Sequence, residues 1–98
     1  MRIQVTAEAR RDWRAILRYL QQKFGPATEQ QAIILLQQLF ANLLRNPGRG
    51  RPVKSEVYPD LRVCILKKSL VFYRVSEGVI RVVRIMDGRQ DPRRWLAL

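Results

Sequence analysis

Histidine is absent from the sequence, and cysteine occurs once, as Cys64. These scarcities leave no support for a metal site, because imidazole and thiolate groups are the usual ligands of zinc. A single cysteine also excludes an intramolecular disulfide framework and is typical of a reducing compartment. We therefore predict no metal and no cofactor, and we interpret Cys64 as a small buried strand residue rather than as a reactive thiol.

Long apolar runs are missing as well. No segment approaches the roughly 20 apolar residues that a membrane-spanning helix needs, and the first residues are charged and alternating, unlike a signal peptide. We therefore expect a cytoplasmic protein that does not enter a membrane. The segment GRGR at residues 48–51 lacks the strand-to-helix context of a phosphate-binding loop, so we interpret it as a solvated turn.

Positive charge, by contrast, is abundant. The 98 residues carry 19 Lys and Arg against 8 Asp and Glu, which gives a formal net charge of +11, and 15 of the basic residues are Arg. Guanidinium groups match carboxylates and phosphates in a bidentate geometry. Because self-repulsion of this size destabilises a small domain, the composition favours an acidic partner, either nucleic acid or an acidic protein.

The hydrophobic pattern predicts an α+β fold in a single domain. Residues 2–6 alternate like a short strand, and apolar residues then recur at helical spacing over residues 7–23 and again from residue 28 to residue 45. Gly25-Pro26 separates the two helices, and so short a connection makes them antiparallel neighbours. We expect this helical hairpin on one face of a mostly antiparallel sheet. Its last three strands form a meander over residues 61–66, 70–75 and 79–86.

The pattern also gives several local expectations. We expect the side chain of Trp13 in the core, and we allow a further short strand over residues 53–58. A helical turn over residues 93–98 would bring Trp95 and Leu96 back onto the core. Strict alternation in the last strand would place Val79, Arg81, Val83 and Ile85 on one face. It would place Ile80, Val82, Arg84 and Met86 on the other.

Several short motifs, in this order and spacing, resemble the RelE/ParE family of toxins from type II toxin–antitoxin systems, which include plasmid stabilisation proteins. They are Phe24-Gly25, Asn46-Pro47, Gly50-Arg51, Leu61-Arg62, VFYRV at residues 71–75 and RIMDGRQD at residues 84–91. The similarity covers essentially the whole chain and implies one RelE/ParE-like toxin domain over residues 1–98. It also implies a cognate acidic antitoxin protein as partner. The assembly that it implies is either a homodimer of the toxin or a toxin–antitoxin hetero-oligomer.

The RelE branch of this family cleaves messenger RNA on the ribosome. Such metal-free cleavage needs an activated 2′-OH, a stabilised phosphorane charge and a protonated leaving oxygen. The resemblance implies basic catalytic residues at places that Lys54, Arg62 and Arg89 match. The place for a Tyr or His after the last strand is empty, because the sequence has no His and no Tyr beyond Tyr73. We interpret Asp91, the remaining candidate base, as a helix cap or an arginine partner.

The ParE branch lacks that nuclease set and acts by binding DNA gyrase. Its basic closing segment resembles residues 87–91 (DGRQD), although Asp87 stands where many relatives have His. We therefore favour a ParE-like toxin that inhibits gyrase by binding, is not an enzyme, and is neutralised by its antitoxin. The residues expected to contact gyrase, DNA or the antitoxin are Lys54, Arg62, Arg84 and Arg89. A RelE-like endoribonuclease acting on ribosome-bound mRNA remains the alternative.

A basic nucleic-acid-binding module without toxicity is a further alternative. It would make contacts to phosphates and show a steep dependence of affinity on salt. The sequence offers no aromatic stacking platform at regular spacing, because Tyr58, Phe72 and Tyr73 suit a core equally well.

Overall fold

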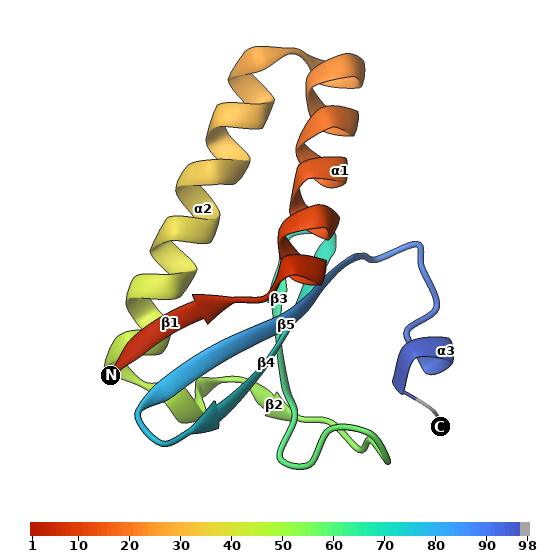
Figure 1. The fold of residues 1–98 in the computed structure, drawn as a ribbon. Helices are drawn as coiled ribbons and strands as arrows, with labels where there is room; N and C mark the ends of the chain where they lie inside the picture. Colours follow the sequence, from red (N-terminus) through yellow and green to blue (C-terminus); the bar gives the residue numbers. More distant parts are fainter. Residues whose placement is uncertain (97–98) are drawn as a thin grey trace.

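A computed structural model describes residues 1–96, including every side chain of that range except those of Arg94 and Trp95. The elements are β1 (Arg2–Val5), α1 (Ala7–Phe24), α2 (Pro26–Arg45), the 3₁₀ turn η1 (Pro47–Arg49), β2 (Arg51–Pro52), β3 (Arg62–Leu66), β4 (Ser69–Ser76), β5 (Val79–Asp87) and α3 (Arg93–Leu96). A strand, a helical hairpin and a three-stranded meander follow one another as expected (Figure 1). The α+β fold class is therefore confirmed.

All strands belong to one five-stranded sheet in the order β1-β5-β4-β3-β2. The sheet is mixed, because β1 runs parallel to β5 while β5, β4, β3 and β2 pair antiparallel. After β1, the helical hairpin leads to the meander, whose last strand, β5, lies beside β1 (Figure 1). The first and last strands of the chain therefore lie side by side.

The sheet carries a hydrophobic cluster on each face. On one face, α1 and α2 contribute Ala9, Leu36, Leu39 and Leu43 to a cluster with the strand residues Val71, Tyr73, Ile80, Val82 and Ile85. The other face is covered by Leu96 of α3 and by Val53 and Tyr58, which pack on Leu61, Val63, Phe72, Val83 and Met86. Both helices of the hairpin therefore cover one face, as expected, and the second face is closed by loop 53–60 and α3.

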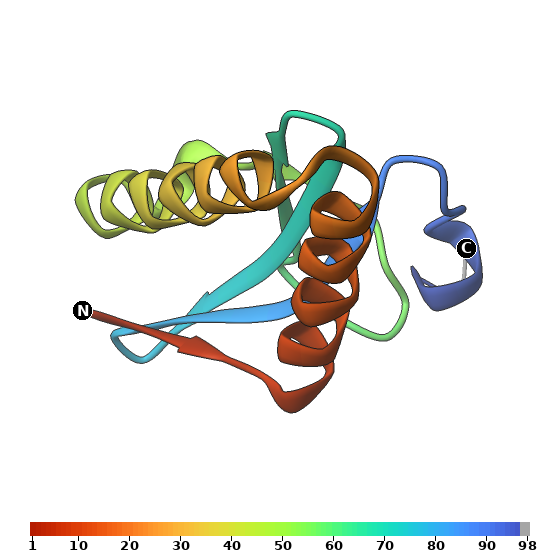
Figure 2. The same ribbon diagram turned by 90° about the horizontal axis from the view of Figure 1, so that it is seen from above.

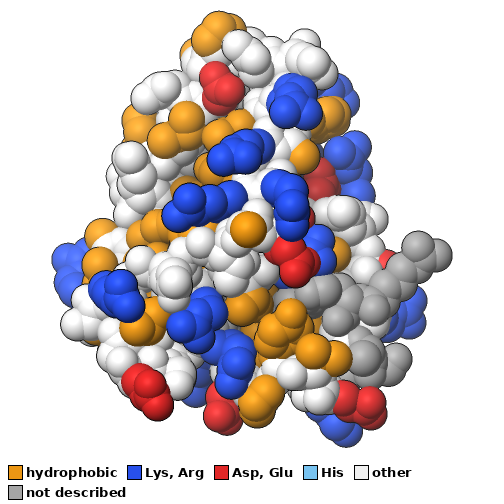
Figure 3. Space-filling model, in the orientation of Figure 1, with side chains coloured by type: hydrophobic (Ala, Val, Ile, Leu, Met, Phe, Trp, Pro, Cys, Tyr) orange, Lys and Arg blue, Asp and Glu red, His pale blue; other side chains and the backbone are white. Residues whose placement is uncertain are grey.

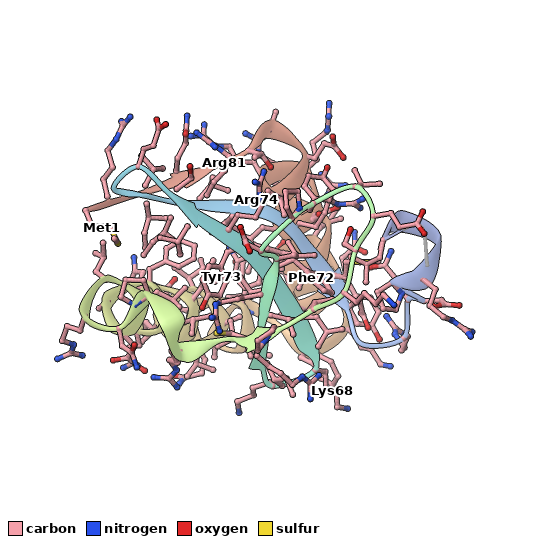
Figure 4. The ribbon with its side chains drawn as sticks, turned by 90° about the horizontal axis from the view of Figure 1, so that it is seen from below. Met1, Lys68, Phe72, Tyr73, Arg74 and Arg81 are labelled. Carbon is pink, nitrogen blue, oxygen red and sulfur yellow. The ribbon has the colours of Figure 1, made fainter. Side chains whose placement is uncertain are left out.

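The alternation that we expected in β5 is wrong beyond Val83. The pairing of β4 with β5 shifts between Phe72 and Tyr73, where a β-bulge places an extra residue in β5. A bulge reverses the side-chain alternation that follows it. Ile85 therefore joins the helix-side cluster and Met86 the opposite one, the reverse of the simple pattern. Figure 4 shows Phe72 and Tyr73, the residues at this shift, on β4.

The N-terminal half of α1 lies along the free edge of β5. The backbone N–H of Thr6 donates to Val82 O at 3.0 Å, and its hydroxyl donates to Val83 O at 3.1 Å. Six residues further along the chain, the Asp12 carboxylate accepts from the backbone N–H of Ile85 at 3.0 Å. The edge that β1 leaves uncovered is thus hydrogen-bonded by the helix, which fixes α1 on the sheet.

Two other local expectations need correction. Residues 53–58 form a loop rather than a strand, and the short β2 pairs instead with Arg62 and Val63 of β3. Trp13 is only partly buried beside the helix-side cluster, so it is not the core residue that we expected. Leu96 does fold back onto the core, being 3% exposed. The expected helical turn ends at Leu96, and residues 97–98 and the side chain of Trp95 lie outside the described part.

Cys64 is buried, as interpreted from the sequence, with an exposed fraction of 7%. Burial raises the pKa of its thiol, because desolvation disfavours the charged thiolate. No helix within residues 1–96 is long and apolar enough to cross a membrane.

Candidate binding groove

A groove opens where the two helices extend beyond the sheet. It lies between the C-terminal half of α1, the start of α2, the β3–β4 turn and the turn that follows β5. Figures 1 and 2 show how these segments are arranged. Its cavity volume is about 950 Å³, which is the size of a site for a drug-like ligand or for a few side chains of a partner. We refer to it as the inter-helix groove.

The floor of the inter-helix groove is apolar. Trp13, Ile16 and Leu20 of α1 line it from one side, Leu35 of α2 from another and Leu66 of β3 from below. Phe24 also lines the cavity and leaves 57% of its surface exposed. Exposed apolar surface of this kind is typical of a site that a partner covers.

The rim of the groove is basic. Lys23, Lys67, Lys68 and Arg89 line it, and Asp87 is the one acidic lining residue among those that the structure describes. Asp87 is engaged by Arg89, whose Nη2 lies 3.0 Å from one carboxylate oxygen and whose backbone N–H donates to the other at 2.9 Å. These bonds from Arg89 lower the pKa of the Asp87 carboxyl. The rim therefore carries net positive charge around an apolar floor.

A close backbone contact holds two parts of the rim together. The backbone N–H of Gly88 donates to Lys68 O, which ties the turn after β5 to the β3–β4 turn. A Cβ atom at Gly88 would lie 2.6 Å from that carbonyl oxygen, a distance that real Cβ atoms do not occupy. Glycine is therefore required here, and it places Arg89 and Lys68 on adjoining parts of the rim.

Tyr19 completes the rim, although we did not predict it as a site residue from the sequence. Its hydroxyl accepts from Lys23 Nζ at 3.0 Å, and the guanidinium carbon of Arg89 lies 4.8 Å from the centre of its ring. The hydrogen bond from Lys23 lowers the pKa of the Tyr19 phenol, and the charge of Arg89 acts in the same direction. The four-residue spacing of Tyr19 and Lys23 on a helix could have signalled their pairing. No local signal could have shown the contact with Arg89.

The structure does not bring together the four basic residues expected to form a binding site. Arg89 lies on the groove rim with 70% of its side chain exposed. Arg84 lies at the junction of α1 and β5, where its Nε donates to Asp12 at 2.7 Å and its side chain is 21% exposed. Arg62 donates to the carbonyl oxygens of residues 48 and 50 at 3.2 and 2.7 Å. Lys54 lies exposed in the loop after β2.

The register of the sheet shows how far apart these residues are. Arg62 is in register with Tyr73, which pairs with Val82, whereas Arg89 follows Asp87 at the far end of β5. The strand from Val82 to Asp87 spans about 16 Å at the usual rise per residue. Groups that act on one phosphate must all reach it by hydrogen bonds, so the nuclease candidates Lys54, Arg62 and Arg89 do not form one site here.

Tyr73 and Arg62 both hold the connection between α2 and β2. The buried hydroxyl of Tyr73 accepts from Gly50 N and donates to Pro47 O, each at 2.8 Å, so it anchors this connection. Arg62 bonds the same connection from its exposed side. The two side chains together bond to the backbone N–H of Gly50 and to the carbonyl oxygens of residues 47, 48 and 50. Figure 4 shows Tyr73 close to this segment.

Comparison with known proteins identifies the family. The family model "ParE toxin of type II toxin-antitoxin system, parDE" matches residues 3–92. The chain belongs to the ParE toxin family. A curated relative, Toxin ParE of Escherichia coli, is 35% identical over 89 residues, which cover 89% of this chain and 84% of that protein. The protein is therefore a toxin of a type II toxin–antitoxin system, and the resemblance noted in the sequence is confirmed.

Solved structures support the fold of this ParE-family toxin. A chain of the chromosomal ParDE toxin–antitoxin system from Pseudomonas aeruginosa superimposes with a TM-score of 0.73 at 24% identity, covering 89% of this chain and 95% of that one. The conserved hypothetical protein HP0894 from Helicobacter pylori gives a TM-score of 0.53 at 16% identity, covering 89% and 93%. These likenesses show a shared fold of two helices on a mixed sheet.

Proposed function

We propose that this ParE-family toxin arrests growth by binding DNA gyrase. We further propose that an antitoxin neutralises it by filling the inter-helix groove with an acidic amphipathic segment. The observation that carries the proposal is the groove itself, with its apolar floor and basic rim. It provides a surface for binding a macromolecule, and the basic residues expected of the nuclease branch do not converge on one point.

The antitoxin segment follows from the chemistry of the groove. A helix with one apolar face can lie over Trp13, Leu20 and Phe24, and its acidic side chains then reach Lys23 and Arg89 on the rim. A segment that folds as it binds buries apolar surface and pairs its charges in the same step. An acidic chain also offsets the net charge of +11, which the toxin carries alone.

The four basic residues take two different parts in this proposal. Arg89 and Lys54 are exposed and contact the target or the antitoxin directly. Arg62 and Arg84 hold the surfaces from which those contacts are made, because their guanidinium groups bond to residues 48–50 and to Asp12. We therefore expect substitution of Arg62 or Arg84 to lower the stability of the fold more than it weakens binding of the target or the antitoxin.

The target can be tested by pulse labelling after brief induction of the toxin in a bacterial host. Thymidine and methionine incorporation are followed in the same culture. Early loss of DNA synthesis with continued protein synthesis supports gyrase as the target, and inhibition of supercoiling by the purified toxin then follows. Early loss of protein synthesis instead would show a RelE-like action on translation and overturn the proposal.

The groove can be tested with a matched pair of arginines. Arg89 pairs with Asp87 and Arg93 pairs with Asp91 in the same local geometry, but Arg93 does not line the groove. We expect Arg89→Ala to weaken antitoxin affinity about tenfold, as for loss of a charged contact at an interface. Arg93→Ala should leave the affinity unchanged. Equal effects of the two substitutions, measured by calorimetry, would place the antitoxin elsewhere.

A further inference from the structure

The outward face of α1 carries a row of arginines that neither the core nor the inter-helix groove uses. Arg10, Arg14 and Arg18 follow one another at four-residue spacing, and Arg11 lies beside them; all four are exposed. Side chains four residues apart lie on the same face of a helix. Figure 3 shows Lys and Arg side chains gathered over α1, while the surface over α2 is mostly apolar or uncharged. We call these four residues the arginine stripe.

The acidic residues of α1 do not neutralise the arginine stripe. Asp12 and Glu8 both face Arg84 of β5, at 2.7 and 3.9 Å, on another side of the helix. Within the described residues, no carboxylate lies within ion-pair distance of the four stripe arginines. Like charges at this spacing destabilise a helix by about 0.2–0.5 kcal/mol for each pair. The fold therefore retains a repulsive feature that an anionic partner would relieve.

The geometry of the stripe favours a rigid polyanion. With 1.5 Å of rise per residue, Arg10, Arg14 and Arg18 lie about 6 Å apart and span about 12 Å of straight helix. Duplex DNA carries about one charge per 1.7 Å of its axis, so about seven phosphates pass the same length. The helix is fixed to β5 by Thr6 and Asp12, so the backbone positions of the array are set before it binds.

We propose that the arginine stripe of α1 binds the phosphate backbone of duplex DNA. The residues exposed beside the stripe are small or polar, Ala7, Ala15, Gln21 and Gln22, so it lacks the apolar centre that protein interfaces have. It also lacks aromatic side chains to stack unpaired bases, because Trp13 and Tyr19 line the groove. Phosphate contacts need neither feature.

The choice of DNA over duplex RNA rests on the proposed gyrase target, since gyrase holds duplex DNA. Binding of naked DNA by the stripe does not require gyrase, so the two proposals can fail separately. If the toxin binds DNA but does not inhibit supercoiling, the DNA-binding proposal stands and the gyrase proposal fails. If the toxin inhibits supercoiling but its stripe variant binds DNA as tightly as wild type, the gyrase proposal stands and the DNA-binding proposal fails.

The test compares two variants that each lose three positive charges. One is Arg10→Gln/Arg14→Gln/Arg18→Gln, and the control is Arg45→Gln/Arg49→Gln/Arg51→Gln, whose arginines are also exposed. Binding to a short fluorescein-labelled DNA duplex is measured by anisotropy over a range of KCl concentrations. Each phosphate that the protein no longer neutralises lowers the slope of log affinity against log salt by about one. Glutamine is a good helix former, so circular dichroism should show both variants folded.

We expect the stripe variant to bind at least about tenfold more weakly and its salt slope to fall by about three, while the control keeps both values close to wild type. Equal losses in the two variants would show a response to net charge alone and overturn the proposal. Tighter binding of duplex RNA or of single-stranded DNA would overturn the choice of duplex DNA. If poly-glutamate binds the stripe as tightly as DNA, the surface serves an acidic protein instead.

Discussion

The two helices of the hairpin are nearly equal in length and differ sharply in charge. α1 contains five basic and two acidic residues, whereas α2 has Glu29 and Arg45 as its ionisable residues and none between them. α2 buries Leu36, Leu39 and Leu43, while α1 buries Ala9 alone of its residues in the structure. α2 is therefore held by apolar packing, whereas α1 combines the packing of Ala9, Trp13 and Ile16 with polar contacts to the edge of β5.

The two helices of one hairpin can therefore differ in how they attach to the sheet and in what they expose to solvent. A helix anchored by apolar contacts has no need of surface charge, and α2 leaves Ile34 and Leu44 exposed at 37% and 43%. A helix anchored by Asp12 and Thr6 can present arginines on its remaining faces, because its attachment does not use them. The groove lies toward the other end of the hairpin, between the C-terminal half of α1 and the start of α2.

The largest effect should come from the apolar anchor of α2. Leu43 is fully buried, so Leu43→Ala should reduce the free energy of unfolding by about 3 kcal/mol through lost transfer energy and the cavity left behind. Leu44→Ala, at a neighbouring exposed position, should cost less than about 1 kcal/mol. Urea denaturation of both variants measures the difference, and similar costs would show that α2 is not held by this face.

The polar anchor of α1 should give the next largest effect. Asp12→Ala leaves the partly buried Arg84 without its closest carboxylate and Ile85 N–H without its acceptor, so we expect a loss of about 2 kcal/mol. Glu8→Ala should change stability by less than about 0.5 kcal/mol, because Glu8 is 59% exposed and 3.9 Å from Arg84. If the two variants unfold at the same urea concentration, Asp12 is not the anchor.

Charge repulsion on α1 should give a smaller effect of opposite sign. Arg14→Gln removes a charge between Arg10 and Arg18 and should raise stability by about 0.5 kcal/mol at low ionic strength. High salt should abolish the gain, because exposed charges are screened. Gln38→Arg on the uncharged face of α2 should change little in either condition. Thermal melts at two ionic strengths test this, and a gain that survives high salt would contradict the electrostatic reason.

The smallest effect concerns the groove rim in acid. The pKa of Asp87 is lowered from its ordinary value of 3.8 in the folded protein. A lowered pKa means that the ionised form contributes stability above that ordinary value, and the contribution disappears as pH falls through the folded pKa. The amide shift of Arg89 in NMR spectra should therefore titrate with a midpoint below 3.8. Arg89→Gln should raise that midpoint, and an unchanged midpoint would assign the shift to another group.

Much of the fold could be predicted because its signals are local. Helical spacing, the Gly25-Pro26 break and the three apolar strands are properties of neighbouring residues, and all of these elements are present. The alternation in β5 could not be read locally, because its bulge arises from pairing with β4. The parallel pairing of β1 with β5 joins residues almost 80 positions apart in the sequence. The hydrophobic periodicity of each strand does not indicate which strand it pairs with.

The site was less predictable for a similar reason. Arginine identity was visible in the sequence, but its use depends on partners brought from elsewhere, such as Asp12 for Arg84. We expected Trp13 of α1 in the core, yet Trp13 and Phe24 both line the groove. A pattern shows that a residue faces inward on its helix, and only the arrangement of helices shows whether anything covers it.

The attachment of α1 to β5 also bears on how the chain avoids self-association. An unpaired strand edge is a template on which other strands can add, and natural sheets commonly cover or charge such edges. Here Thr6 and Asp12 satisfy the backbone of β5 beyond the end of β1, so a helix takes the place of the missing strand. Loss of Asp12 would leave the backbone N–H of Ile85 unpaired on this edge, so part of the protection against self-association comes from one carboxylate.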